Sequence, residues 1–173
     1  MAILGGAVVA GSGGTSSPTT TVDPNASLVD PSTTTTLLES VAGKPCVPLG
    51  DPLPAGAPAV PVKAGPPPTD LIKEDLKVGD GAEVAASNTL EVNYIGVSCS
   101  TGKIFDSSWS RNQTASFALN QVIVGWQQGL VGMKVGGERL LGIPSALAYG
   151  AQGRPGIAPD EALWFVVDVV SVK

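Results

Sequence analysis

The sequence predicts an α+β domain, in which several antiparallel strands accompany one short helix, preceded by a disordered N-terminal region. Three observations support this prediction. Glycine (22) and proline (15) together make up 37 of the 173 residues, far more than an all-helical bundle uses. The prolines are concentrated early, and none occurs from Thr69 to Ile143, so regular structure is expected there. After residue 69, short alternating or β-branched segments outnumber helical ones.

The first 14 residues carry no charge and resemble part of a secretory signal. Their apolar run, Ala2–Ala10, is about half of the ~20 residues needed to cross a bilayer, and VVA at 8–10 fits a small-residue cleavage site. A basic n-region is missing, because no Lys or Arg occurs before Lys44. The alternatives are a disordered Gly/Ala tail or a start codon placed too far downstream. Together with the following segment, residues 1–14 favour an extracytoplasmic protein that is secreted or associated with the cell envelope.

Residues 15–43 are predicted to form a disordered tether. Fifteen of the 22 residues from 15 to 36 are Thr, Ser or Pro, and so little apolar surface cannot offset the ordering entropy. Such tethers commonly separate an exported domain from a membrane or wall, and an ordinary flexible tail is the alternative. Residues 44–69 contain nine prolines and predict an extended, polyproline-like lead-in to a domain at 70–173.

The two cysteines bear on whether the chain is exported. Cys46 lies in the lead-in and Cys99 at the end of a predicted strand, and the chain has no others. In an exported chain this pair suggests a disulfide that ties the lead-in to the sheet. The alternative is two unrelated thiols in a cytosolic protein. Closing a loop of about 50 residues would contribute ~4 kcal/mol by the chain-entropy model.

Strands are predicted at several places in the domain. From 89 to 94 apolar residues alternate with polar ones, which is typical of a half-buried strand. STGK at 100–103 predicts a hairpin turn into Ile104 and Phe105. The stretch 162–172 is β-branched and mostly apolar, and predicts a central strand covered on both faces. Further short strands are expected at 71–76, 116–119 and 139–143.

One helix is expected, over Val122–Val131. Ile123, Trp126 and Leu130 recur there with the i, i+3, i+7 spacing of a single helix face.

The composition excludes several classes of function. The chain has no histidine, which removes Ser-His-Asp and Cys-His triads and His-ligated zinc, and two cysteines cannot build a four-thiolate site. We therefore expect neither a metal nor a cofactor. With 10 Lys and Arg against 15 Asp and Glu, the net charge of −5 is a poor match for a phosphate backbone, so no nucleic-acid partner is expected.

Five segments, in order and without large gaps, resemble the FKBP-type peptidyl-prolyl isomerases. They are YIG at 94–96, GKIFDSS at 102–108, VIVGWQQGLVGMKVGGERLLGIP at 122–144, LAYGAQGRPGIAP at 147–159 and LWFVVDVV at 163–170. The resemblance implies a twisted antiparallel β-sheet wrapped around one short α-helix, with the active pocket between them. It also implies proline-containing polypeptides as partners and a pocket that binds macrolides such as tacrolimus. With the export signals, it indicates a secreted bacterial member, which we expect to be a monomer.

The resemblance assigns ten residues to this pocket. Asp106, Trp126 and Tyr149 are the expected catalytic residues: Trp126 forms the floor, the Tyr149 hydroxyl holds a substrate carbonyl, and Asp106 orients the polar edge. Without this context Trp126 would be an ordinary core residue and Asp106 a turn cap. The residues expected to bind substrate are Tyr94, Phe105, Arg111 (as partner of Asp106), Val122, Ile123 (through its backbone N–H), Ile157 and Phe165.

These residue types suit proline isomerisation. Amide rotation costs ~18–20 kcal/mol because the twisted state loses resonance, and X-Pro bonds isomerise over tens to hundreds of seconds. A twisted amide is less polar than a planar one, so an apolar pocket can bind it better. We therefore predict an isomerase for exported proteins. Ala115 stands where many relatives have a pocket phenylalanine, which predicts a missing wall and weaker binding. The alternative is a non-catalytic proline-peptide-binding module or chaperone that uses the same pocket.

Overall fold

The computed structural model describes residues 38–173. The signal-like segment 1–14 and the tether up to residue 37 lie outside the described residues, and the expectations for them stay predictions. Within 38–173, no helix has both the length and the apolar character that a membrane span requires.

The strands are β1 Ile72–Lys77, β2 Thr89–Ser98, β3 Ile104–Ser107, β4 Ala115–Ala118, β5 Glu138–Ile143 and β6 Leu163–Val172. They form a single antiparallel sheet in the order β1-β5-β6-β2-β3, with β4 also paired to β2. The apolar strand β6 lies between β5 and β2, so the predicted central strand is confirmed. Strand β1 is an edge strand, and most of its side chains are exposed.

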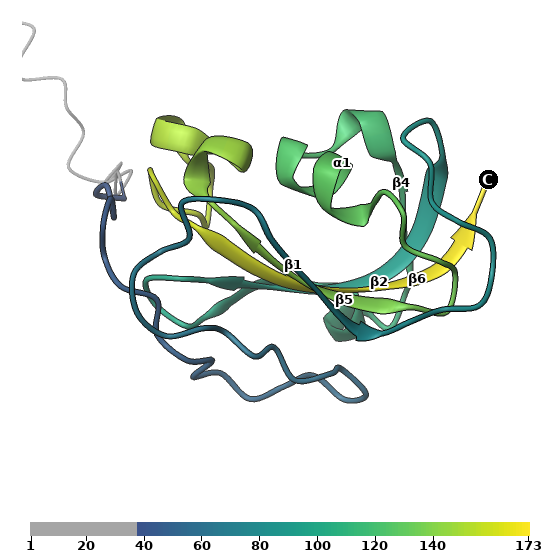
Figure 1. Cartoon of the computed structure of the whole chain (residues 1–173). Helices are drawn as coiled ribbons and strands as arrows, with labels where there is room; N and C mark the ends of the chain where they lie inside the picture. Colours follow the sequence, from purple (N-terminus) through teal and green to yellow (C-terminus); the bar gives the residue numbers. More distant parts are fainter. Residues whose placement is uncertain (1–37) are drawn as a thin grey trace, which may run out of the picture. The chain divides into compact units, whose positions relative to one another are not determined.

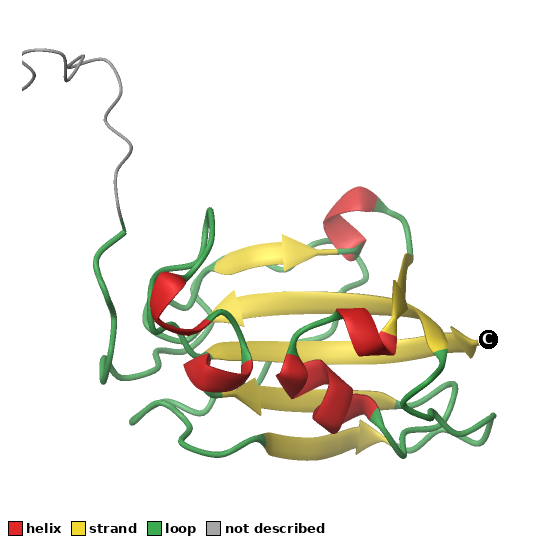
Figure 2. Cartoon of the chain, turned by 90° about the horizontal axis from the view of Figure 1, so that it is seen from above, coloured by secondary structure: helices red, strands yellow, loops and turns green. Residues whose placement is uncertain are grey.

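The helix α1, Val124–Leu130, packs across one face of this sheet (Figures 1 and 2). It can approach β5 closely because Gly125 faces the side chain of Ile143; a Cβ at Gly125 would come within 2.4 Å of it. The predicted window was two residues too long at its start. Ile123 is extended, and its carbonyl accepts the first helical hydrogen bonds, so it caps the helix from outside. Short 3-10 turns occupy Trp109–Arg111, Leu119–Gln121, Ser145–Leu147 and Gly150–Gln152.

Side chains are buried on both faces of the sheet. On the helix side, the core includes Leu90, Trp126 and Phe165; on the opposite side, it includes Ile95 and Trp164. Within residues 38–173, one antiparallel sheet with one α-helix on one of its faces confirms the predicted α+β class.

The proline-rich lead-in covers the face opposite the helix, where Figure 1 shows it running beneath the sheet. Its residues Cys46 and Val60 are only 2% and 5% exposed. A disulfide joins Cys46 to Cys99, as the cysteine placement suggested, and the Trp164 indole N–H lies 3.3 Å from the Cys46 sulfur. The lead-in is therefore part of the folded unit.

The predicted tether ends earlier than residue 43. The backbone N–H of Val41 donates to the carbonyl of Pro159 at 3.0 Å, and the Ser40 hydroxyl donates to the Asp160 carboxylate at 2.6 Å. These contacts order the last residues of that segment against the loop that precedes β6, which composition alone did not indicate.

Candidate active site

A cavity of about 670 Å³ opens between α1, the helix-side face of the sheet and the loop that precedes β6. This volume lies within the range of small-ligand sites. Nine of the ten predicted pocket residues line the cavity, and the tenth, Arg111, bonds to a lining residue. The nine are Tyr94, Phe105, Asp106, Val122, Ile123, Trp126, Tyr149, Ile157 and Phe165.

Aromatic rings form the floor of the cavity. The Trp126 ring meets Tyr94, Phe117 and Phe165 edge to face, with centroid separations of 5.4, 5.7 and 5.4 Å. Phe105 meets Phe165 in the same way at 5.5 Å. Edge-to-face pairs are worth about 0.5–1.5 kcal/mol each beyond area burial, so the floor is held rigidly. Trp126 is 5% exposed, and its indole N–H has no hydrogen-bond partner within residues 38–173.

The polar edge of the cavity is a three-residue network. The Tyr94 hydroxyl donates to Asp106 Oδ2 at 2.5 Å, and Arg111 donates both to Asp106 Oδ1 and, at 2.9 Å, to the Tyr94 hydroxyl oxygen. The expected pairing of Asp106 with Arg111 is confirmed. Ser108, which is fully buried, holds the strand by accepting the Tyr94 backbone N–H at 2.9 Å.

This network fixes two protonation states. Burial acts to raise the pKa of Asp106, but the hydrogen bonds from Tyr94 and Arg111 outweigh it, and the pKa lies below its ordinary value. Burial, followed by the hydrogen bond to Asp106, raises the pKa of Tyr94 to about 12. At neutral pH the carboxyl is therefore charged and the phenol is protonated.

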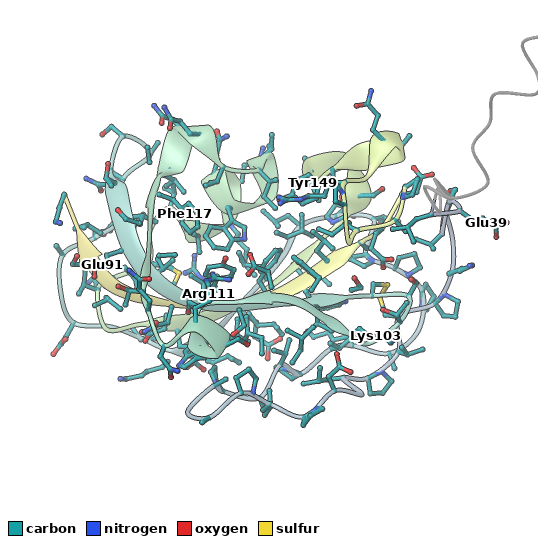
Figure 3. The ribbon with its side chains drawn as sticks, turned by 180° about the vertical axis from the view of Figure 1, so that it is seen from behind. Glu39, Glu91, Lys103, Arg111, Phe117 and Tyr149 are labelled. Atoms are coloured by element: carbon teal, nitrogen blue, oxygen red, sulfur yellow. A yellow bond between two sulfur atoms is a disulfide. The ribbon has the colours of Figure 1, made fainter. Side chains whose placement is uncertain are left out.

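Two hydrogen-bond donors are available to a ligand in the cavity. The backbone N–H of Ile123, at the start of α1, donates to no group within the described residues. The Tyr149 hydroxyl accepts a hydrogen bond from Arg154 at 2.9 Å, which leaves its own proton free to donate. Figure 3 shows Tyr149 and Phe117 on the helix side of the sheet.

The expectation of a missing wall at Ala115 is wrong. The aromatic wall comes from Phe117, two residues later on β4, whose ring meets Tyr94 at 5.9 Å and Trp126 at 5.7 Å. Residues 115 and 117 share a face of the strand, and Phe117 lies opposite the buried Leu90 of β2. The period-2 pattern of β4 was the signal that could have found it. The other lining residues that the sequence prediction missed are Gln121, Arg154 and Pro155.

The site contains groups that bind and orient. Its titratable lining residues other than tyrosine are Asp106 and Arg154, and within residues 38–173 no cluster of acidic side chains and cysteines is arranged to hold a metal ion. The cavity therefore offers an apolar floor, the free donors of Ile123 and Tyr149, the paired carboxylate of Asp106 and the guanidinium of Arg154.

Comparison with known proteins identifies the family. The model of the FKBP-type peptidyl-prolyl cis-trans isomerases matches residues 81–170. The chain is 46% identical over 114 residues to the "Probable FK506-binding protein" of Corynebacterium glutamicum, covering 66% of this chain and 97% of that one. It is 50% identical over 119 residues to the "FK506-binding protein" of Streptomyces anulatus, covering 66% and 96%.

A solved structure supports the same family. The crystal structure of FkpA from Escherichia coli superimposes with a TM-score of 0.58 at 42% identity. The match covers 61% of this chain and 49% of that one, so the alignment spans about half of FkpA. With this fold, this pocket and relatives matched over almost their whole length, the chain belongs to the FKBP-type family of peptidyl-prolyl cis-trans isomerases and is an enzyme of that class.

Proposed function

We propose that the 670 Å³ cavity is the isomerase site, and that it binds the twisted X-Pro amide more tightly than the planar one. Trp126, Phe165 and Ile157 would enclose the proline ring. The Ile123 N–H and the Tyr149 hydroxyl would hold the flanking carbonyls. Amide rotation breaks no covalent bond, so the site needs neither a nucleophile nor a proton acceptor.

One observation carries the proposal. Two hydrogen-bond donors, the Ile123 N–H and the Tyr149 hydroxyl, line the same cavity as the Trp126 floor. A polypeptide segment around proline has that mixture of an apolar ring and backbone carbonyls. The polar edge supports the floor, since the Tyr94 ring that packs on Trp126 is held by Asp106 and Arg111.

Substitution of Trp126 tests the location of the site. Trp126→Ala should lower kcat/KM on a short X-Pro peptide at least tenfold, because the floor is lost. Trp109→Ala is the matched control: Trp109 packs against the opposite face of the sheet, and its variant should keep wild-type turnover.

Because Trp→Ala at a buried position can cost ~3–5 kcal/mol, Trp126→Leu provides a second variant that preserves more of the core. Circular dichroism at the assay temperature establishes that each variant is folded. Near-native turnover in a folded Trp126 variant would show that the site lies elsewhere.

We further propose that the enzyme acts outside the cytoplasm on exported polypeptides. The Cys46–Cys99 disulfide supports this, since such bonds persist mainly in oxidising compartments. Alkylation of protein isolated from its native compartment without reductant should label no thiol. Two labelled thiols would contradict the proposed location.

The cavity is also proposed to bind macrolides, as the names of the two FK506-binding relatives suggest. Tacrolimus should therefore inhibit turnover competitively. We propose a monomer, because the residues of one chain complete the cavity; light scattering on eluting protein tests this. One reason for the non-catalytic alternative was a missing wall at Ala115, and Phe117 supplies an aromatic wall there.

A further inference from the structure

Arg154 gives the cavity an unneutralised positive charge. Arg154 and Asp106 are the two residues with formal charge that line it, and Asp106 is paired with Arg111. Arg154 forms no salt bridge with any carboxylate of residues 38–173. The chain as a whole has a net charge of −5, so Arg154 is a positive charge in a protein that is acidic overall.

The backbone of Arg154 is fixed at the rim. Arg154 and Ile157 exchange two backbone hydrogen bonds, of 2.9 and 2.8 Å, across Pro155 and Gly156. Proline followed by a glycine with φ of 86° is the pattern of a type II turn. Because Pro155 and Ile157 line the cavity as well, this turn holds Arg154 at the rim of the cavity.

The acidic residues nearest to Arg154 in the sequence are hydrogen-bonded to other residues. The Asp160 carboxylate accepts the Ser40 hydroxyl at 2.6 Å. Glu161 is buried and accepts both the backbone N–H and the hydroxyl of Ser100, at 2.8 and 2.7 Å. Arg154 itself donates through Nη1 to the Tyr149 hydroxyl at 2.9 Å and lies 5.0 Å from the centre of that ring. Its remaining donors are therefore open to a ligand.

We propose that Arg154 is a specificity-determining residue that favours substrates with Asp or Glu directly beside the proline. The proposal rests on the proposed function, in which the Tyr149 hydroxyl holds a substrate carbonyl. A guanidinium that is hydrogen-bonded to the hydroxyl holding that carbonyl is within reach of the side chain of an adjacent substrate residue. Arg154 is exposed, and exposed ion pairs are weak, so the expected preference is about threefold to fivefold in kcat/KM.

The test compares matched peptides that differ only in charge. Exchange NMR, which needs no helper protease, measures kcat/KM on Glu-Pro against Gln-Pro peptides, and on Pro-Glu against Pro-Gln peptides, at pH 7. The wild type should prefer the Glu peptide of at least one pair threefold to fivefold at low salt. The preference should fall toward one at 0.5 M salt, because screening weakens exposed pairs.

Three variants isolate the cause. Arg154→Gln should bring the Glu-to-Gln ratio to about one, whatever common loss follows from the missing bond to Tyr149. Arg154→Lys should keep part of the ratio, since the charge remains. Lys103→Gln removes the same charge from an exposed position at the β2–β3 hairpin, away from Tyr149 in Figure 3, and should leave ratio and turnover unchanged.

The outcomes separate this proposal from the proposed function. Equal wild-type rates on Glu and Gln peptides in both pairs, or a ratio that survives Arg154→Gln, would overturn the role of Arg154 while the enzyme still turns over Gln peptides. Failure to turn over any peptide would contradict the proposed function itself.

Discussion

Removal of the Cys46–Cys99 disulfide should cost stability without costing catalysis. The bond lies on the face of the sheet opposite the cavity, and both cysteines are almost fully buried, at 2% and 1% exposure. The perturbation is the double variant Cys46→Ala, Cys99→Ala, which removes the covalent link to the lead-in but leaves Val60 of the lead-in in the core that contains Trp164.

The magnitude follows from the loop that the bond closes. The two cysteines are 53 residues apart, and the chain-entropy model gives a stabilisation of about 4 kcal/mol for such a loop. Measured values are commonly lower, so we expect a loss of about 2–4 kcal/mol in the free energy of unfolding. With a urea dependence of about 2 kcal/mol per molar, the midpoint should fall by about 1–2 M.

Urea unfolding followed by tryptophan fluorescence measures this loss, with oxidised wild type, reduced wild type and the double variant compared side by side. Reduced wild type is the matched control, because it loses the bond and keeps both side chains. Both altered forms should unfold earlier, and kcat/KM in the absence of urea should stay within twofold of wild type. Equal midpoints would refute the argument from loop closure, and lost turnover in a folded protein would refute the separation of the two faces.

Two further substitutions test the electrostatics. Asp106→Ala should lower kcat/KM about tenfold, equivalent to ~1.4 kcal/mol, because Tyr94 and Arg111 lose their shared acceptor. Its unfolding midpoint should change little, since the ion pair is half-exposed, and wild-type activity would exclude a role for the network. Burial and then the charge of Asp168 directly opposite on β6 raise the pKa of Glu138, so its carboxylate destabilises the fold at neutral pH. Glu138→Gln should therefore be more stable at pH 7 by about 0.5 kcal/mol. The gain should shrink as the pH falls through the raised pKa of Glu138 in the folded protein toward its ordinary value of 4.5, and it should vanish below 4.5, where Glu138 is protonated in both states; a loss of stability at pH 7 would contradict this.

The sequence predicted the elements that depend on local pattern. Alternation between 89 and 94 and the β-branched run of 162–172 each correspond to a strand, β2 and β6, in the expected order. The helix was found because Trp126 and Leu130 both face the sheet. Its start was misplaced because the first residues of that pattern are extended, with Ile123 serving as cap.

What local pattern could not predict depends on long-range packing. The proline-rich lead-in has no periodicity, so nothing in it indicated that Val60 would enter a core with Ile95 and Trp164. At the pocket, the resemblance placed the missing wall at Ala115, although only the position of β4 against β2 decides which side chain reaches Trp126. The orientation of Arg154 likewise depends on a turn closed by Ile157, not on its own neighbours in sequence.

The pH dependence of turnover tests the central claim most directly, namely that the cavity rotates the amide without proton transfer. The pKa of Asp106 is lowered and that of Tyr94 is raised to about 12, so neither changes charge between about pH 5.5 and 8. The chain has no histidine that could titrate in this window. The measurement is kcat/KM on one peptide with a non-titrating residue before proline. We predict a flat profile across this range, with activity lost only below about pH 4 as Asp106 takes up its proton. A bell-shaped profile centred near neutrality would reveal an acid–base step and contradict the account.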